Sequence, residues 1–390
     1  PTFATSHQTY VDAPIAVGEA QVASTNSASD WKTVLVAGTG GGGSGVFALD
    51  VSDPAAFDSS KVMWEFKRTD DNDIGQVIGQ PRIMKFKTSG SASTPTYRWF
   101  AVVASGVNNY VTDAAGNFST TGKPALFLLA LDKPVGTSWA EGTNYYKISI
   151  PVDASLAATT APGLVNFNAL YGTSGEVTDI YMGDLHGKLW KLSFGQLLPS
   201  DWTMEKLSYF NKGTETSPIP YPMFIAKSGS TVQPITAPPT LFTGPVVGGL
   251  ETFYVMFGTG KYLESADNIS TLTNSFYALL EQRLAASGYA VVQTTSPLVA
   301  RQSFWTVVQT IESVGLSTAP YHAHVPSFGE WGYVIASRRP WRLPDALPPG
   351  LRFLSPPSLP LLFDFPLDMA RVPADVNRLS NQALVHSYER

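Results

Sequence analysis

The sequence predicts a mainly β protein, with a β-propeller over residues 1–275 and a partial Rossmann-like α/β segment over residues 276–390. Charged residues make up only 15% of the chain, whereas Gly (33), Pro (29) and aromatic residues (12%) are plentiful. This composition favours short strands joined by tight turns. One strand, turn and strand pattern recurs in the first part, and the last part changes to helical spacing of apolar residues.

The recurring unit is clearest in Val34–Val51, where two apolar runs flank a glycine turn and the second run ends at an aspartate. Such a pattern predicts a hairpin. Degenerate copies follow at Phe100–Asp132, Asp179–Phe194 and Phe253–Ser265. A glycine ends the first apolar run of each copy, at Gly38, Gly106, Gly183 and Gly258. Continuous apolar runs are typical of blades that bury both faces against their neighbours. The visible units are fewer than in the larger propellers, so we expect an incomplete propeller.

The last part begins with a predicted helix from Phe276 to Gly288, whose apolar residues Leu279, Leu280 and Leu284 share one face. Glycine stops helices well, which places the end at Gly288. The elements expected after it are a strand at 289–293, a helix at 303–315 and a hairpin of 321–327 with 331–337. This order of helix, strand, helix and hairpin is typical of the C-terminal half of a Rossmann-like methyltransferase fold.

Charge and composition exclude several classes of protein. The formal net charge is −5 and no cluster of Lys and Arg occurs, so nucleic acid is not an expected partner. The absence of cysteine excludes disulfides and thiol sites. No apolar run is long enough for a transmembrane helix. The first residue is Pro1 and no signal peptide follows, so we expect the sequence to begin inside a longer gene product.

Five ordered blocks resemble the C-terminal domain of PilY proteins of bacterial type IV pili. They are TYVDAPIAVGEAQV from Thr9, WKTVLVAGTGGGGSGVFALDVSDP from Trp31, IGQPRI from Ile78, YMGDLHGKLWKLSF from Tyr181 and YVMFGTGKYLES from Tyr254. The resemblance implies a quinoprotein-like propeller that is not an enzyme and that serves pilus assembly and surface adhesion. It also implies an extracytoplasmic location in bacteria, with pilus components or a host or abiotic surface as partners.

The last part resembles the C-terminal region of bacterial spermidine synthases. The blocks that carry this likeness are VVQTTSP, ARQSFW, YHAHVPSFGEWGYVIAS and FPLDMARVPADVNRLSNQALVHSYE. In that family the aminopropyl-donor loop and the catalytic aspartate lie upstream of the helix that should begin at Phe276, and propeller-like sequence occupies this space here. We therefore expect a chimera joined near Asn274, with no catalytic residue. The alternatives are a polyamine synthase-related fragment and a quinoprotein-type dehydrogenase.

Two loops of the first part are candidate sites. Successive N–H groups of the run Gly38–Gly45 suggest a phosphate or S-adenosylmethionine loop, but Val46–Val51 continues as strand and favours a turn. The run Arg68–Gly75 is rich in acidic and amide side chains and suggests calcium. Its ligand spacing is not alternating, so a solvated turn is favoured, with weak attraction for cations.

Several single polar residues are also candidates for metal or substrate binding. His322 and His324 alternate along a strand as a metal pair would, but with no acidic residue near in sequence we expect ordinary strand residues. Gln293 and Tyr321 match the polyamine cleft of the synthases, yet packing is the favoured role. His186, in a Gly-Asp-Leu-His-Gly turn, is assigned to the loop. We expect no cofactor-binding or metal-binding residue.

PilY propellers commonly carry a calcium loop of the form D-x-D-x-D-G-x-x-D. The resemblance places its ligand positions at residues of the stretch 170–178, namely Leu170, Gly172, Ser174, Gly175 and Thr178. Only the glycine matches, and calcium sites need several carboxylates. Glu176 lies between these positions and Asp179 lies one residue beyond them. We therefore predict an ordinary hairpin turn at Tyr171–Thr178 and no calcium cofactor.

Overall fold

The computed structural model describes residues 10–23, 27–90, 94–214, 216–244, 252–270, 273–282, 289–313, 315–326, 329–337, 340–344, 347–377 and 383–384. Backbone contacts divide the chain into two compact units, which we treat separately. The first comprises Pro1–Phe242 and Val255–Ala278, and the second comprises Thr243–Tyr254 and Leu279–Arg390. The boundary expected between residues 275 and 276 stays a prediction. Within the described residues, no helix is both long and apolar enough to cross a bilayer.

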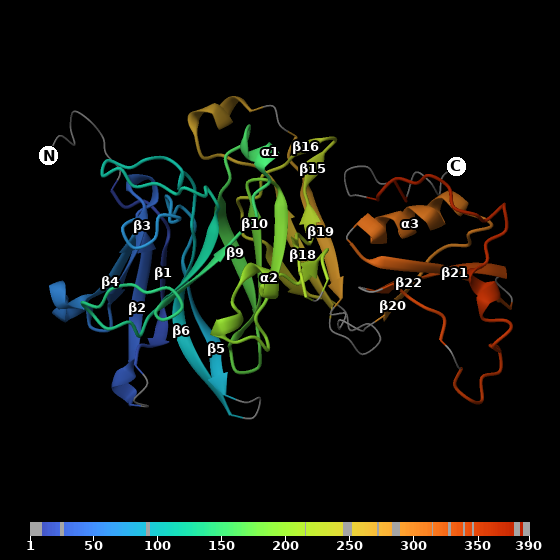
Figure 1. The fold of residues 1–390 in the computed structure, drawn as a ribbon, viewed down its shortest axis with the longest axis horizontal. Helices are drawn as coiled ribbons and strands as arrows, with labels where there is room; N and C mark the ends of the chain where they lie inside the picture. The colour runs from blue at the N-terminus through green and yellow to red at the C-terminus, as the bar shows by residue number, and fades with distance from the viewer. Residues whose placement is uncertain are drawn as a thin grey trace. The chain divides into compact units, whose positions relative to one another are not determined.

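The first unit begins with a four-stranded antiparallel meander, here called blade 1, in which each strand pairs with the next (Figure 1). Its strands are β1 (Ile15–Gln21), β2 (Trp31–Gly38), β3 (Gly45–Asp50) and β4 (Val62–Lys67). The hairpin predicted at Val34–Val51 is confirmed as β2 and β3, with Leu35 opposite Leu49. Alternate side chains such as Val36 and Ala48 are fully buried on one face, as the strand period requires.

Two further four-stranded sheets follow along the chain. Blade 2 is a meander of β5 (Arg82–Gly90), β6 (Pro95–Ala104), β7 (Ala125–Ala130) and β8 (Tyr145–Ser149). Blade 3 has the order β14, β11, β10, β9, with β9 (Leu164–Tyr171), β10 (Val177–Asp184), β11 (Lys188–Ser193) and β14 (Phe224–Ile225). The sequence copies in 100–132 and 179–194 thus contain strands that pair in one sheet, as expected.

Hydrophobic cores form where blades meet face to face. Between blades 1 and 2, Phe66 of β4 packs against Phe127 of β7, with ring centroids 5.3 Å apart. Between blades 2 and 3, Trp202 contacts the rings of Phe100 and Phe194 at 5.8 and 5.6 Å. Every strand of blade 2 therefore contributes to two cores, and β7 is buried at all its residues. This explains why its apolar run is continuous rather than alternating.

A three-stranded sheet in the order β17, β18, β19 ends the mainly β region, with β17 (Thr240–Thr243), β18 (Thr252–Gly258) and β19 (Phe276–Gln282). The helix expected from Phe276 is wrong over these residues, and its expected remainder to Gly288 lies outside the described residues. Tyr277 stacks on Phe257 at 5.2 Å and its hydroxyl donates to Gln233 Oε1 at 2.6 Å. These contacts and pairing with β18 outweigh the helical spacing.

The stretch Phe253–Ser265 was expected to be a complete hairpin, and this is wrong because only its first strand, β18, forms. Residues 261–270 instead form a turn with a 3-10 helix at Ser265–Ile269. Asp267 accepts the N–H groups of Leu263 and Glu264 at 2.7 and 3.0 Å, and it lies 2.9 Å from Lys261 Nζ. These local bonds satisfy two of the N–H groups that a second strand would have paired.

The recurrent glycines mark equivalent strands. Gly38 ends β2, Gly106 follows β6, Gly183 lies in β10 and Gly258 ends β18, and each of these is the second strand in its sheet along the chain. Gly106 has φ +76°, and a Cβ there would lie 1.7 Å from the Gln76 carbonyl oxygen. Only glycine therefore allows the segment that enters blade 2 to cross at this point.

Short elements complete the first unit. They are the helices α1 (Ala154–Ala157) and α2 (Met204–Leu207), the pair β12 (Phe210–Asn211) and β13 (Pro220–Tyr221), and the pair β15 (Lys227–Ser228) and β16 (Thr231–Val232). Other 3-10 helices are Ala28–Asp30, Gly40–Gly42, Pro54–Ala56, Ser59–Lys61, Pro199–Asp201 and, in the second unit, Pro360–Phe363.

The second unit contains a three-stranded sheet, with β20 (Tyr289–Gln293), β21 (Ser317–Val325) and β22 (Gly329–Ser337), covered by α3 (Arg301–Ser313). β22 lies between β20 and β21 and is antiparallel to both, so the outer strands are parallel to each other. The strand, helix and hairpin order is confirmed, and the tail is Rossmann-like. Phe304 fills the space above Gly332, where a Cβ would lie 2.3 Å from its ring.

Candidate binding site at the glycine-rich loop

The glycine-rich loop between β2 and β3 holds a carboxylate of the chain itself. Gly40 has φ +64° in the turn Gly40–Gly42. Asp12 lies against this turn, and its Oδ1 accepts the N–H of Gly41 at 2.7 Å. The Thr39 N–H donates to the Gly45 carbonyl at 3.0 Å and closes the loop. The favoured reading as a turn is confirmed, because strand β3 follows the loop directly.

Arg68 of the acidic run is buried, with only 5% of its surface exposed. Its Nε donates to the Ile74 carbonyl, and its Nη2 donates to the Asn108 carbonyl at 2.7 Å. Nη1 donates to the carbonyls of Val111 and Asn117. A single guanidinium therefore ties the segment between blades 1 and 2 to the loop that follows β6.

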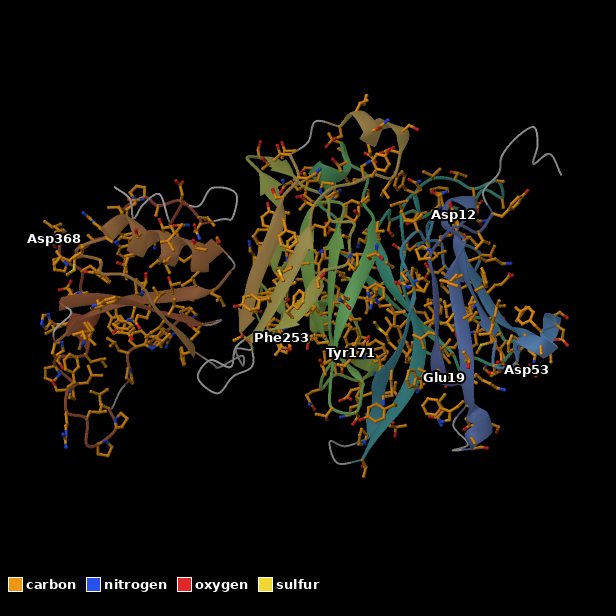
Figure 2. All side chains as sticks on the ribbon, turned by 180° about the vertical axis from the view of Figure 1, so that it is seen from behind. Asp12, Glu19, Asp53, Tyr171, Phe253 and Asp368 are labelled. Atoms are coloured by element: carbon orange, nitrogen blue, oxygen red, sulfur yellow. The ribbon has the colours of Figure 1, made fainter. Side chains whose placement is uncertain are left out.

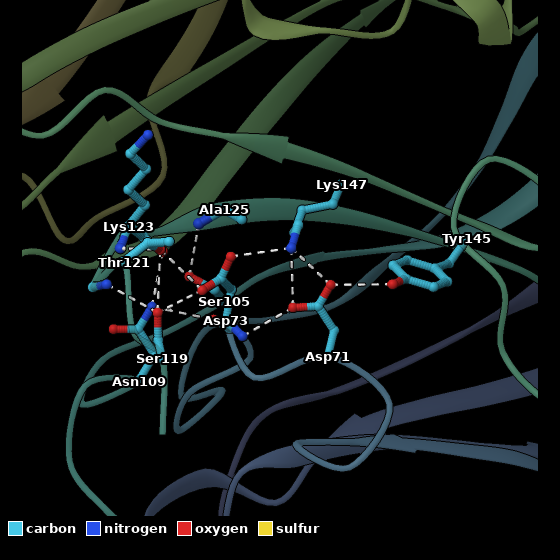
Figure 3. Close-up of polar contacts among 11 residues, drawn as sticks. Asp71, Asp73, Ser105, Asn109, Ser119, Thr121, Lys123, Ala125, Tyr145 and Lys147 are labelled. Carbon is cyan, nitrogen blue, oxygen red and sulfur yellow. Dashed lines mark hydrogen bonds and ion pairs between the residues drawn. The ribbon is translucent and has the colours of Figure 1, made fainter. Parts of the chain in front are cut away.

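Asp71 and Asp73 of the same run enclose the ammonium group of Lys147 on β8, as Figure 3 shows. Lys147 Nζ lies 2.8 Å from Asp71 Oδ2 and 3.1 Å from Asp73 Oδ2. Burial alone lowers the pKa of Lys147, but its bonds and charge attraction to the two carboxylates outweigh this effect and raise that pKa. Burial, and then the charge of Asp71, raises the pKa of Tyr145, whose hydroxyl donates to Asp71 at 3.1 Å.

The expectation of a solvated turn at Arg68–Gly75 is therefore wrong. Arg68 and Asp73 are buried, and Asp73 also accepts the hydroxyls of Ser119 and Thr121 at 2.5 and 3.1 Å. These two hydroxyl partners lie 46 and 48 residues from Asp73 along the chain, so no local sequence pattern predicts the contacts. The cation that these carboxylates hold is a lysine of the protein.

The glycine-rich loop, the Arg68 segment and the loop 108–117 surround an open hollow of about 450 Å³. Its charged lining residues are Lys67, Arg68 and Asp113. Asn108, on its wall, has φ +60°, the one such non-glycine residue in the described part of the chain. Left-handed backbone at a non-glycine residue is strained and is concentrated at functional sites. Sequence reasoning missed Asn108, because nothing in its neighbours signals this conformation.

The stretch 170–178 lies at the other end of the blades from Asp12, as the positions of Asp12 and Tyr171 in Figure 2 show. The predicted hairpin turn between β9 and β10 is confirmed: the Gly172 N–H donates to the Glu176 carbonyl at 2.8 Å and Gly175 has φ +75°. Glu176 Oε2 accepts the Ser174 N–H at 3.0 Å. Asp179 is buried, accepts the Ser193 hydroxyl, and lies 3.6 Å from Lys191 Nζ.

The profile of the PilY1 beta-propeller domain matches residues 3–306 of this sequence. The chain belongs to the PilY1 β-propeller family. A type IV pilus biogenesis factor PilY1 homologue of Xylella fastidiosa is 30% identical over 302 residues, which are 76% of this chain and 17% of that protein. The crystal structure of the Pseudomonas aeruginosa PilY1 C-terminal domain has a TM-score of 0.52 and 24% identity, over 70% of this chain and 50% of that chain. That likeness shows the fold.

This member of the PilY1 family also carries sequence of a second kind. A polyamine aminopropyltransferase of Leptospira interrogans is 46% identical over 118 residues, which are 30% of this chain and 24% of that enzyme. Polyamine aminopropyltransferase 2 of Ralstonia nicotianae is 43% identical over 116 residues. The chain thus spans a quarter or less of the length of the curated relatives it matches.

The two histidines of β21, His322 and His324, contact polar atoms of the protein itself. His322 Nε2 lies 2.7 Å from the Asp364 carbonyl oxygen, and its Nδ1 lies 2.5 Å from Glu330 Oε1. His324 is 3.6 Å from the other oxygen of Glu330. No acidic residue is near these histidines in the sequence, but β22 brings Glu330 opposite His324 in space. Both histidines are strand residues of β21, as expected. Within the described ranges, no group of three or more His, Cys, Asp or Glu side chains has metal-site geometry.

The remaining candidates separate into packed and exposed residues. Tyr321 stacks on Tyr333 at 5.1 Å, which confirms a packing role, whereas Gln293 at the end of β20 is exposed and packing is wrong for it. His186 is buried and its Nε2 lies 2.9 Å from the Thr160 carbonyl oxygen, which confirms a loop role. Beside it, Asp184 accepts the indole N–H of Trp190 at 2.9 Å and fixes the turn.

Proposed function

We propose that this chain is a non-catalytic part of a type IV pilus biogenesis factor, and that it acts outside the cytoplasm of a bacterium in pilus assembly and adhesion. The observation that carries this proposal is the set of stacked four-stranded sheets with a core at each blade junction. Such a scaffold is rigid and presents its loops at both ends of the strands. Its partners are pilus components or a host or abiotic surface.

The test is complementation in a bacterium that lacks its own PilY1-type protein. The full chain replaces the matching C-terminal region of the native protein, and surface pili and twitching motility are measured. We expect pili to be restored. A matched control carries the same native protein without any C-terminal region. Absence of pili, despite stable and exported fusion protein, contradicts the proposal.

For the tail we propose a chimera without enzyme activity. The similar aminopropyltransferases are matched over a quarter or less of their length, and the described tail consists of β20, α3 and the β21–β22 hairpin with the segment after it. The second candidate function, polyamine aminopropyl transfer, is favoured by the 46% identity to an enzyme of that name. General-base catalysis needs a positioned acceptor for the amine proton, and the resemblance locates that aspartate in the part of the family that this chain does not match.

We also propose that any pilus role is independent of calcium at the stretch 170–178. Glu176 and Asp179, the acidic residues nearest the expected ligand positions, are engaged with a backbone N–H, a serine hydroxyl and a lysine. Binding of calcium there requires those bonds to break, and calcium affinity follows the number of free carboxylates.

A further inference from the structure

Arg68 brings a buried positive charge to the floor of the hollow beside the glycine-rich loop. Four of its N–H groups donate to carbonyl oxygens, which carry no net charge. No carboxylate among the residues described here lies within ion-pair distance of the guanidinium, and one Nη2 N–H has no partner among them. Bonds from Asn117 are the main cause of the lowered pKa of Asp113, and the charge of Arg68 adds to that lowering. No carboxylate bonds to the guanidinium directly, however, and a buried cation without an ion-pair partner is costly. The hollow is therefore set to favour a negative group.

Other groups around the hollow point to the same chemistry. Lys67 adds a second positive charge; its side chain is 58% exposed, and its Nζ lies 3.8 Å from Oε2 of the exposed Glu65. The single carboxylate of the lining, Asp113, already accepts the N–H groups of Ala115 and Asn117 at 2.9 and 2.8 Å. The residues that line the hollow thus carry two cations and one carboxylate, and Glu65, the carboxylate paired with Lys67, is not among them.

Neutral hydrogen-bonding groups complete the lining. The N–H groups of Gly43 and Ser44 have no backbone acceptor among the described residues. The hydroxyls of Ser44, Thr69 and Thr112 likewise have no partner in the described part of the chain. The size of the hollow suits a small molecule. A ligand with one negative group and several hydroxyls matches this arrangement of charge and hydrogen-bonding groups.

We propose that this hollow binds a small polyhydroxylated carboxylic acid of monosaccharide size, such as a hexuronic acid. The carboxylate lies toward Arg68 and Lys67, and the sugar hydroxyls bond to the loop N–H groups and to Ser44, Thr69 and Thr112. Asn108, held in its strained conformation by the Arg68 bond to its carbonyl, keeps the wall of the hollow in place. This site is independent of the proposed role in pilus assembly.

The test is isothermal titration of the full chain with galacturonate, galactose and inorganic phosphate at one ionic strength. We expect galacturonate to bind with a Kd of about 1 mM or lower and galactose at least about tenfold more weakly. Lys67→Gln is expected to weaken galacturonate about fivefold, the effect of one exposed charge, and Thr112→Trp to abolish binding by filling the hollow. Lys227→Gln, which removes an exposed charge elsewhere, leaves binding unchanged.

Three outcomes overturn the proposal. The first is no galacturonate binding by the wild-type chain up to about 10 mM. The second is equal binding of galactose, which removes the role of the two cations. The third is phosphate binding as tight as galacturonate, which makes the hollow a site for bare anions. Circular dichroism of each variant confirms that lost binding is not lost folding.

Discussion

At the scale of single residues, Lys147 is the counter-charge of the segment that links blades 1 and 2. Lys147→Ala leaves Asp71 and Asp73 facing each other without a cation. We expect the free energy of unfolding to fall by about 2 kcal/mol, less than for a fully dry pair because Lys147 keeps some solvent access. Urea denaturation of the wild type and the variant measures this change in the free energy of unfolding. The control Lys206→Ala breaks an exposed pair with Asp201 and should change little; equal losses for the two variants contradict the role of burial.

Substitution of Gly40 tests whether the Asp12 carboxylate is bound against the glycine-rich turn. Gly40 and Gly122 have φ +64° and +60°, but a Cβ at Gly40 would lie 1.8 Å from Asp12 Oδ1, whereas Gly122 has nothing within 4 Å. Both alanine variants carry the same backbone strain, because each places a Cβ at a residue with positive φ. We expect Gly40→Ala to cost at least about 1 kcal/mol more than Gly122→Ala, because Asp12 must move. Thermal unfolding compares them, and matching Tm values show that Asp12 is not held there.

At the scale of elements, the prediction concerns calcium binding at the turn between β9 and β10 of blade 3. We expect titration calorimetry of the full chain with calcium to give no binding tighter than roughly millimolar at this turn. Glu176→Ala is the matched variant, since Glu176 holds the turn through the Ser174 N–H. Submillimolar binding that disappears in Glu176→Ala means that the turn opens to coordinate calcium, against our proposal.

The same scale explains the strand that replaced an expected helix. Phe276, Leu279, Leu280 and Leu284 are spaced as on a helical face, whereas a strand, whose side chains alternate between two faces, does not gather all four positions on one side. Tyr277 decides the outcome, because its ring packs against both Phe224 and Phe257 and its hydroxyl donates to the Lys227 carbonyl and to Gln233 Oε1. Those partners are distant in sequence.

At the scale of the whole molecule, the chain joins a PilY1-family propeller to sequence similar to aminopropyltransferases. We expect no spermidine when the full chain is incubated with putrescine and decarboxylated S-adenosylmethionine, because aminopropyl transfer needs a positioned base for the amine proton and we propose that the tail carries none. Chromatography of the products measures this, with the Leptospira interrogans enzyme as the positive control. Spermidine above the level of a heat-denatured sample contradicts the proposal of an inactive tail.

The sequence by itself determined the mainly β class, the equivalence of Gly38, Gly106, Gly183 and Gly258, the hairpins at 34–51 and 179–194, and the strand, helix and hairpin of the tail. Each of these depends on residues close together along the chain, where periodicity and turn chemistry act. The turn at 171–178 was predicted for the same reason.

Tertiary structure alone decided the placement of charge. The sequence showed Arg68–Gly75 as a polar run, and only folding buried Arg68 under the loop 108–117 and brought Lys147 to Asp71 and Asp73. It also placed Asp12 in the glycine-rich loop and Glu330 beside His322 and His324. Burial and charge pairing depend on groups dozens of residues apart, and the low dielectric of their surroundings gives these pairs their energy. A local stretch of sequence therefore shows neither which charged side chains become buried nor which of them pair.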